Sequence, residues 1–232
     1  MMPMAKKQVE LVVARHEEDL AWLGNTSPDL KITVYNKGPD APSPRAMAVV
    51  NLPNTGREAH SYLQHLVQRY ETLSPLTLFC QGKPFDHAPD LHRILRELCA
   101  GQKTVADFLW LGFLIDTDDK RGRRLFVPWS KNPSGRELPL DECFRKIFGT
   151  ESPEQFRFFG GAQFVVTAEC VRSRPKSFYE KVLQVVLEEE LAPHALERIW
   201  DRMFGVIGVS EDMMQGRETV YLKPIRRLAE DK

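Results

Sequence analysis

Residues 9–14 read VELVVA, a run of mainly apolar and β-branched residues that predicts a buried strand near the start of the chain. Residues 31–36 read KITVYN and predict a second strand of the same kind. Further apolar runs predict strands at residues 76–80 and 162–167. Because helix-like segments separate these strands, the pattern favours an α/β domain with a mainly parallel central sheet covered on both faces by helices.

The predicted helices alternate with these strands. A capping box, TGRE at residues 55–58, opens the first strong helix, and a proline-containing loop leads into it from residue 37. The other predicted helices are a segment around residues 91–101, a short helix opening at residues 152–155, a long one over 177–191 and a final one over 196–204.

The apolar segment Phe108 to Ile115 predicts a central strand or a pair of strands. The charged residues 116–124 after it predict a tight exposed turn leading to residues 125–127. At 232 residues the chain favours one domain, with a core over about residues 9–205 and a peripheral tail over residues 206–232.

The amino-acid composition indicates which binding partners and which cellular compartment to expect. Lys and Arg number 32, as do Asp and Glu, so no overall basic charge favours nucleic acid as a partner. The four cysteines are far apart in sequence and form no zinc or redox motif. No apolar run approaches the ~18 residues of a membrane span, and the run at residues 9–14 is too short for a signal peptide. We therefore expect a soluble cytoplasmic protein.

Several blocks together resemble a domain family of unknown function, found in fungi and bacteria, which is itself similar to GT-A-fold glycosyltransferases. The blocks are VVARHEEDLAWL (12–23), YNKG (35–38), NTGREA (54–59), FCQGKPFDH (79–87), GGAQFVV (160–166) and ERIW (197–200). The resemblance implies a single Rossmann-like, GT-A-type domain that binds a nucleotide-sugar donor over the carboxyl ends of its first strands.

The same resemblance implies which residues contact the donor. The matching positions are Arg15, His16, Glu17, Glu18, Asn36, Lys37, Gly38, Gly56, Arg57, Gln81 and Gly82. The family usually has Asn-Glu-Asp after the first strand, and Glu17 replaces the Asn here. Residues 55–58 have two interpretations, a plain helix cap or a diphosphate site at a helix N-terminus assisted by Arg57.

The sequence alone leaves open whether the protein depends on a metal ion. Many GT-A enzymes bind Mn²⁺ or Mg²⁺ through an Asp-x-Asp pair at the end of a central strand, but Gln81 and Gly82 occupy that position here. Asp86 and His87 follow shortly after and can supply metal ligands or contact the acceptor. A rival Asp-x-Asp lies at Asp116 and Asp118, and the alternative there is a solvated turn.

Further positions concern the sugar, the acceptor and the leaving group. By the resemblance, Gly161, Gln163 and Trp200 border the sugar and acceptor, as do Asp86 and His87. Arg172 and Arg174 belong to a basic cluster that can offset the charge of the leaving diphosphate. The alternatives are a loop-to-strand turn for the glycines and a solvated loop for the arginines.

Glu197 is the candidate catalytic base. It lies ~100° from Leu196 on a helix of ~3.6 residues per turn, at the border of the apolar face, where a carboxylate can be partly desolvated. An inverting transferase needs such a base to take the proton of the acceptor hydroxyl. The alternative is a surface glutamate paired with Arg198 or Arg202.

These residues predict a glycosyltransferase that moves a sugar from a nucleotide-sugar donor to an acceptor hydroxyl. Two other functions stay open: a non-catalytic nucleotide- or glycan-binding accessory protein of the same fold, and a metal-dependent hydrolase of nucleotide sugars that uses Asp116 and Asp118. The sugar, the base, the acceptor, the stereochemical outcome and the oligomeric state stay open as well.

Overall fold

The VELVVA segment forms β1 (Val9–Arg15), a strand whose seven residues are all buried inside a six-stranded sheet. The structure is a computed structural model that describes residues 8–40, 47–123 and 137–222. The strand order is β3-β2-β1-β4-β8-β5. The other five strands are β2 (Lys31–Asn36), β3 (Ala48–Asn51), β4 (Leu76–Gln81), β5 (Phe108–Trp110) and β8 (Phe164–Thr167).

Strand direction is mixed, although most of the sheet is parallel. The strands β3, β2, β1 and β4 are mutually parallel, whereas β8 runs antiparallel to both of its neighbours, β4 and β5. The predicted α/β class with a mostly parallel sheet is therefore confirmed, with one antiparallel strand added. The apolar segment 108–115, predicted as a central strand or a pair of strands, enters two strands: β5, which lies at the edge of this sheet beside β8, and the first two residues of a strand in a second sheet.

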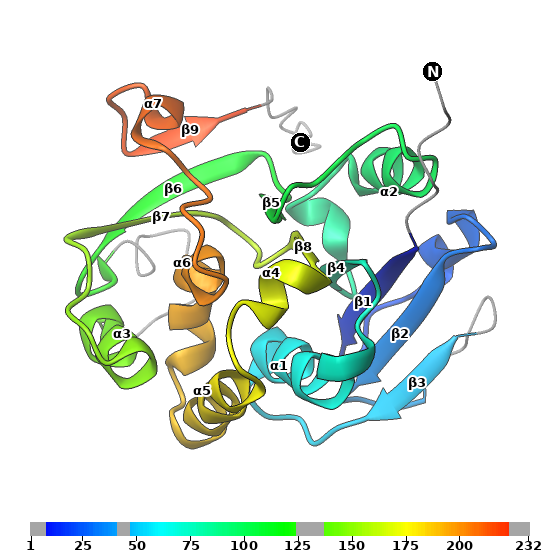
Figure 1. The fold of residues 1–232 in the computed structure, drawn as a ribbon, viewed down its shortest axis with the longest axis horizontal. Helices are drawn as coiled ribbons and strands as arrows, with labels where there is room; N and C mark the ends of the chain where they lie inside the picture. The colour runs from blue at the N-terminus through cyan, green and yellow to red at the C-terminus, as the bar shows by residue number, and fades with distance from the viewer. Residues whose placement is uncertain (1–7, 41–46, 124–136, 223–232) are drawn as a thin grey trace, which may run out of the picture.

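Helices cover both faces of this sheet (Figure 1). Alternate residues of β1 explain why: Val12 and Ala14 belong to one apolar cluster, and Leu11 and Val13 belong to another on the opposite face. The first cluster includes residues of α1 (Arg57–Arg69), α3 (Leu140–Phe148), α4 (Ala168–Arg172), α5 (Lys176–Glu188) and α6 (Ala192–Met203). The second includes residues of α2 (Leu91–Cys99) and of a 3-10 helix, η1 (Ala21–Asn25).

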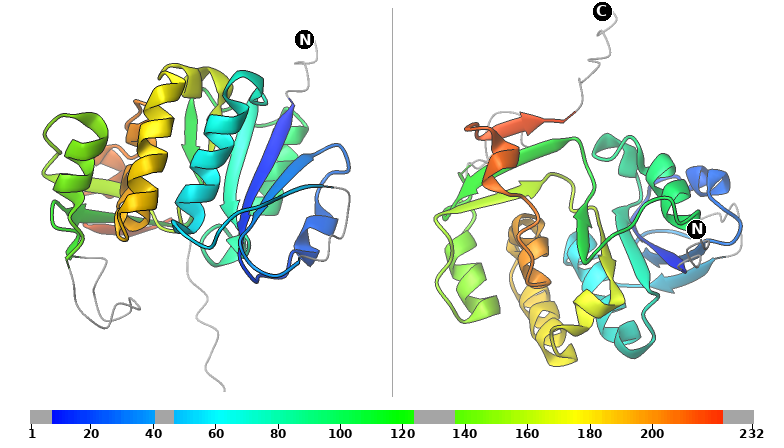
Figure 2. Two further views of the ribbon diagram at one scale, coloured as in Figure 1. Left: turned by 90° about the horizontal axis from the view of Figure 1, so that it is seen from below. Right: turned by 45° about the horizontal axis from the view of Figure 1, so that its top comes forward.

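The helices α1, α5 and α3 form a row, as the left view of Figure 2 shows. Two further 3-10 helices, η2 (Tyr70–Thr72) and η3 (Pro84–Asp86), follow α1 and β4 respectively. The helix α7 (Glu211–Met214) lies near the C-terminal end of the described residues. None of these described helices has the length and apolar character needed to cross a bilayer.

A second, three-stranded antiparallel sheet lies at the upper left of Figure 1, in the order β7-β6-β9. It consists of β6 (Leu114–Asp119), β7 (Gln155–Phe159) and β9 (Thr219–Tyr221). Residues 116–119 are therefore strand and not the predicted turn, while residues 124–127 lie outside the described part of the chain. The segment from residue 206 onward is more than a peripheral tail, because β9 pairs with β6 and Val220 is buried.

Two local predictions were wrong. Residues 152–155 form no helix and instead lead into β7. The pairing of β7 with β6 buries two alternate residues of β7, Phe156 and Phe158. The capping box is also not formed: α1 has Gly56 as its N-cap, and no side chain caps the helix. The helix α3 was not predicted at all.

Aromatic side chains fill the core between the sheet and α6. Trp200 is fully buried and lies 5.1 Å from Phe164 and 5.7 Å from Tyr62, measured between ring centroids. Such clusters supply much of a core's packing energy. This packing fixes the side of α6 that faces the sheet, and it thereby fixes where Glu197 points.

Candidate functional site

The candidate site lies at the carboxyl edge of the parallel strands. The chain passes from β1 to β2 and β3 on one side of β1 and then returns to β4 on its other side, so the connections diverge between β1 and β4. Ligands of open α/β sheets bind outside the carboxyl ends of the strands at such a switch point. The residues that end these strands, Arg15 and Gln81, therefore mark where a ligand site is expected.

A cavity of about 260 Å³ opens at this place. Its lining residues are Ala14, Arg15, His16, Glu18, Lys37, Asn54, Arg57, Glu58 and Gln81. Six of the matching positions are among them: Arg15, His16, Glu18, Lys37, Arg57 and Gln81. The structure thus brings together segments that follow β1, β2, β3 and β4.

Arg15 and Asn36 hold the wall of this cavity together. The Arg15 guanidinium is buried and donates to the Glu18 carbonyl at 2.9 Å, to the His16 carbonyl at 3.0 Å and to Asn36 Oδ1 at 2.6 Å. The Asn36 amide in turn donates to the Gly38 carbonyl and to Asn51 Oδ1. Both side chains therefore tie the strand ends to one another, and their contribution to a ligand is indirect.

The loop after β1 is packed closely against its neighbours. A Cβ on Gly38 would lie 1.9 Å from the His16 carbonyl oxygen, and one on Gly82 would lie 2.8 Å from Glu18 Oε2. Glu18 Oε2 also accepts a hydrogen bond from the His16 amide at 2.7 Å. Glu17 is not among the residues that line the cavity, and its side chain is 71% exposed.

The start of α1 has an unusual backbone. Gly56 has φ = 62° and Arg57 has φ = 46°, which is a left-handed value that is rare for a residue with a Cβ. The Lys37 ammonium donates to the carbonyls of both Thr55 and Arg57 and so holds this turn in place. Strained backbone of this kind is concentrated at functional sites. Burial lowers the pKa of Lys37 to about 8; the nearby Glu58 carboxylate opposes this shift, and Arg57 adds to it to a smaller extent.

Glu197 lies on α6 next to the glycine pair that precedes β8. Its Oε1 accepts the Gly161 amide at 2.6 Å, and its Oε2 accepts the Arg198 guanidinium at 2.8 Å. Burial alone would raise the pKa of Glu197, but Arg198 and the Gly161 amide lower it below the ordinary value. Glu197 is therefore a carboxylate held in one place by Arg198, one of the two partners named in the alternative, but its side chain is only 21% exposed and is not on the open surface.

A second carboxylate, Glu58, is close enough to Glu197 to interact with it electrostatically. The Glu58 side chain lines the cavity and is only 11% exposed. Burial and the negative charge of Glu197 raise its pKa, which Arg57 and Lys37 only partly offset. Two carboxyl groups whose pKa values shift in opposite directions in one site are typical of an acid–base pair.

The structure separates the residues predicted to border the sugar and acceptor. His87 lies against Gly161, where a Cβ would come within 2.4 Å of its ring, and it adds a favourable charge interaction to Glu197. Asp86 is exposed and pairs with Lys83 at 3.0 Å. Gln163 is fully buried, with its amide nitrogen on the Pro84 carbonyl at 2.9 Å.

Gln163 and Trp200 therefore lie behind the site instead of facing an acceptor. Trp200 packs among the core aromatic rings, and no part of it is exposed. Of the residues predicted to border the sugar and acceptor, Gly161 and His87 lie at the carboxyl edge beside Glu197.

Arg172 and Arg174 do not join the site. They follow β8, whose last residue Thr167 pairs with the first residue of β4, Leu76. The two arginines therefore lie at the amino edge, ~17 Å from the cavity edge by the rise of ~3.3 Å per residue along β4. There Arg172 donates to the carbonyls of Tyr70 and Glu71, and Arg174 lies over the Phe178 ring at 4.8 Å.

The residues at the cavity do not fit a divalent cation. The lining includes two carboxylates and one imidazole, from Glu18, Glu58 and His16, but Gln81 offers only a neutral amide and the cations Lys37 and Arg57 line the same cavity. The described residues contain no group of three or more His, Cys, Asp or Glu placed to bind a metal. We therefore derive no catalytic step through a metal ion.

Asp116 and Asp118, the rival candidates for metal binding, lie on β6 of the small sheet and contact other protein side chains. Asp118 is buried and pairs with Arg198 at 3.4 Å, and Asp116 Oδ1 accepts the hydroxyl of Thr219 at 2.8 Å. Neither residue lines the cavity. A row of charged groups thus connects β6 to the site in the order Asp118, Arg198, Glu197.

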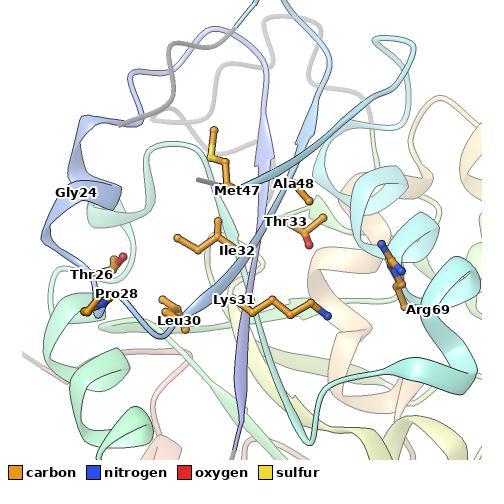
Figure 3. Close-up of a pocket in the computed structure, with 10 residues that line it drawn as sticks. All are labelled: Gly24, Thr26, Pro28, Leu30, Lys31, Ile32, Thr33, Met47, Ala48 and Arg69. Atoms are coloured by element: carbon orange, nitrogen blue, oxygen red, sulfur yellow. The ribbon is translucent and has the colours of Figure 1, made fainter. Parts of the chain in front are cut away.

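A larger hollow of about 730 Å³ lies elsewhere, around the first residues of β2 (Figure 3). Its lining is mainly apolar, and its two cations are Lys31 and Arg69. The Lys31 ammonium pairs at 2.7 Å with the buried Glu10 carboxylate, which also accepts the Thr33 hydroxyl at 2.8 Å. The hollow lies at the amino end of β2, and the described residues of its lining include no acidic one, so we favour the smaller cavity as the functional site.

Sequence reasoning missed two residues of the site. Glu58 was assigned to a helix cap, and Asn54 was given no role, although its amide contacts the ring of His16, one of the matched positions, at 3.1 Å. Nothing local distinguishes Glu58 from a capping glutamate.

Residues 11–220 match the family described as "Protein of unknown function (DUF3431)", and the chain therefore belongs to this family. This match extends over nearly all of the described residues and includes the whole cavity. A comparison with curated proteins found no match.

Proposed function

We propose that this member of the DUF3431 family is a GT-A-type glycosyltransferase that transfers a sugar from a nucleotide-sugar donor to an acceptor hydroxyl. The observation that supports it best is the place of the cavity, at the switch point of the sheet, with Glu58 in its lining and Glu197 nearby. Open α/β sheets bind nucleotides at this position.

The donor's diphosphate would lie against the cations of the cavity. Arg57 and Lys37 are on the cavity wall at the start of α1, a thirteen-residue helix whose first amides favour an anion. The helix dipole and the two cations can offset the negative charge of the leaving diphosphate. In this proposal Arg57 has the role that the sequence analysis assigned to Arg172 and Arg174.

The acceptor would approach from the side of His87 and Glu197. Its hydroxyl oxygen attacks the anomeric carbon as the bond from that carbon to the diphosphate breaks, and the diphosphate keeps the bonding electron pair. A carboxylate must take the hydroxyl proton, and Glu197 is the candidate base. Its hydrogen bonds to Gly161 and Arg198 would hold it in one orientation for this step.

A thermal-shift screen of nucleoside diphosphates and nucleotide sugars tests the donor site. A ligand at 100 times its Kd is expected to stabilise the protein by ~2.7 kcal/mol, and the shift should survive EDTA because no metal site is proposed. Arg57→Ala should weaken the binding about tenfold or more, since it removes a cation from the cavity. Arg172→Ala, at the opposite edge, is the matched control and should leave binding unchanged.

The screen also separates the alternatives. Binding of a nucleotide sugar without turnover across many acceptors would favour the accessory protein of the same fold. Binding that requires manganese would favour the metal-dependent hydrolase. The absence of any ligand-induced shift would contradict the donor site altogether.

A further inference from the structure

The side chain of Lys37 connects the sheet to the start of α1. The Lys37 backbone amide donates to the Arg15 carbonyl at 2.9 Å, which fixes residue 37 beside the end of β1. The Lys37 ammonium donates to the carbonyls of Thr55 and Arg57, in the turn that begins α1. One cation therefore joins the carboxyl edge of the sheet to the first turn of the helix.

The turn that Lys37 contacts has a backbone that needs support. Gly56 has φ = 62° and Arg57 has φ = 46°, and a left-handed residue with a Cβ persists where its surroundings enforce it. A Cβ on Gly56 would lie 2.8 Å from both His60 Cβ and Val186 Cγ1, so α5 packs closely against this turn. The ammonium shared by two carbonyls supplies a second constraint, which acts directly on the residue with the Cβ.

The backbone of the turn sets the direction of the Arg57 side chain. The sign of φ at a residue determines where its Cα–Cβ bond points relative to the chain on either side. Arg57 lines the cavity, and its side chain is 57% exposed. Its Nε lies 3.6 Å from Glu58 Oε2, which is beyond hydrogen-bond distance. The guanidinium therefore depends on the left-handed backbone at residue 57 for its place in the cavity.

The Lys37 ammonium directs its donors at the protein. An ammonium has three N–H donors, and the carbonyls of Thr55 and Arg57 accept two of them. A phosphate bound directly to Lys37 would compete with these carbonyls. On the premise of the proposed donor site, we propose that Lys37 is a positioning residue: its ammonium holds the left-handed turn and so presents Arg57 to the diphosphate, instead of binding the diphosphate itself.

A double-mutant cycle on the binding of UDP and GDP is the first test. Arg57→Ala and Lys37→Met should each weaken binding about tenfold. Because Lys37 acts through Arg57, the double variant should bind within about twofold of Arg57→Ala. Losses that multiply to about a hundredfold would overturn the proposal, since they would show a Lys37 contact that does not depend on Arg57. Unchanged binding in Lys37→Met would overturn it as well.

Lys181→Met is the matched control for this cycle. The Lys181 ammonium also donates to a backbone carbonyl, that of Ile147 in α3, at 3.1 Å. Lys181 is not among the residues that line the cavity, so its loss should leave nucleotide binding unchanged. Lys37→Gln, whose shorter and neutral side chain lacks the ammonium, takes the place of Lys37→Met if that variant does not fold.

A measurement without nucleotide separates this inference from the function on which it rests. A positive φ brings the amide and α protons of one residue close together, so the NOE between them is strong. This NOE at Arg57 should be strong in the wild type and in Lys181→Met and weak in Lys37→Met. A weak NOE in the wild type, or a strong one in Lys37→Met, overturns the proposal. A protein that gives the expected NOEs but binds neither nucleotide would count against the donor site alone.

Discussion

Replacing Glu197 by Gln is expected to lower turnover by about 10²- to 10⁴-fold, the range for loss of a general base. The amide oxygen of Gln can still accept the Gly161 amide, so the loop before β8 should keep its position. The amide nitrogen faces Arg198 without charge, and Asp118 remains as that guanidinium's acidic partner. The fold and donor binding should therefore survive while the proton acceptor is lost.

Steady-state kinetics together with the thermal-shift assay measure both properties in the same variant. Glu180→Gln is the matched control, because Glu180 is an exposed glutamate on the neighbouring helix α5. It should behave as the wild type in both assays. Unchanged turnover in Glu197→Gln would remove Glu197 from the mechanism.

Replacing Arg198 by Met is expected to produce the largest loss of stability. The Arg198 side chain is 3% exposed, pairs with Glu197 at 2.8 Å and with Asp118 at 3.4 Å, and lies 4.6 Å from the centroid of the Phe158 ring. The substitution removes, in a largely buried place, the cation that Glu197 and Asp118 share. Removal of one partner from a buried ion pair costs about 3–5 kcal/mol.

Urea unfolding of Arg198→Met at two pH values measures this loss. Without Arg198 the pKa of Glu197 should rise, since burial then dominates. The folded state would then bind more protons than the unfolded state, so the deficit should be larger at pH 8 than at pH 5. Arg202→Met, one turn further along α6, is the control, because the Arg202 side chain is 31% exposed and lies 3.8 Å from its partner Asp201. A loss below about 1 kcal/mol in Arg198→Met would show that the row Asp118, Arg198, Glu197 does not stabilise the site.

The parts of the fold that the sequence predicted correctly are those with strong local periodicity. The boundaries of β2 agree to the residue, and α1, α5 and α6 begin within a few residues of their predicted starts. Their apolar residues recur at the spacing of the element, so the pattern alone identifies them. By contrast β3 has four residues, most of them exposed, and lies in a segment whose prolines predict a loop.

Strand direction was the main piece of information that the sequence lacked. The apolar residues of β8 are equally compatible with a parallel and an antiparallel strand. Because β8 runs antiparallel, the glycines before it reach the carboxyl edge of the sheet, whereas Arg172 and Arg174 after it lie at the amino edge. The antiparallel direction of β8 therefore places Gly161 beside Glu197 and places both arginines away from the site.

The burial of individual side chains was the second property that the sequence did not reveal. Trp200 and Gln163 have side chains that can bind sugars, but contacts between distant segments cover both of them. Glu58 shows the opposite case, since its spacing from Thr55 matches a helix cap while the left-handed backbone at residues 56 and 57 directs it into the cavity. The electrostatic interaction of Glu58 with Glu197 joins residues 139 positions apart in sequence and follows only from the tertiary structure.

The most direct test of the central claim is to locate nucleotide binding on the protein by an amide NMR titration with nucleoside diphosphates. We expect the shifted amides to cluster at the carboxyl edge, at His16, Lys37, Arg57 and Gln81, in the presence of EDTA. Shifts clustered around Lys31 and Arg69 at the larger hollow, or no shifts with any of the diphosphates, would contradict the assignment of the donor site to this cavity.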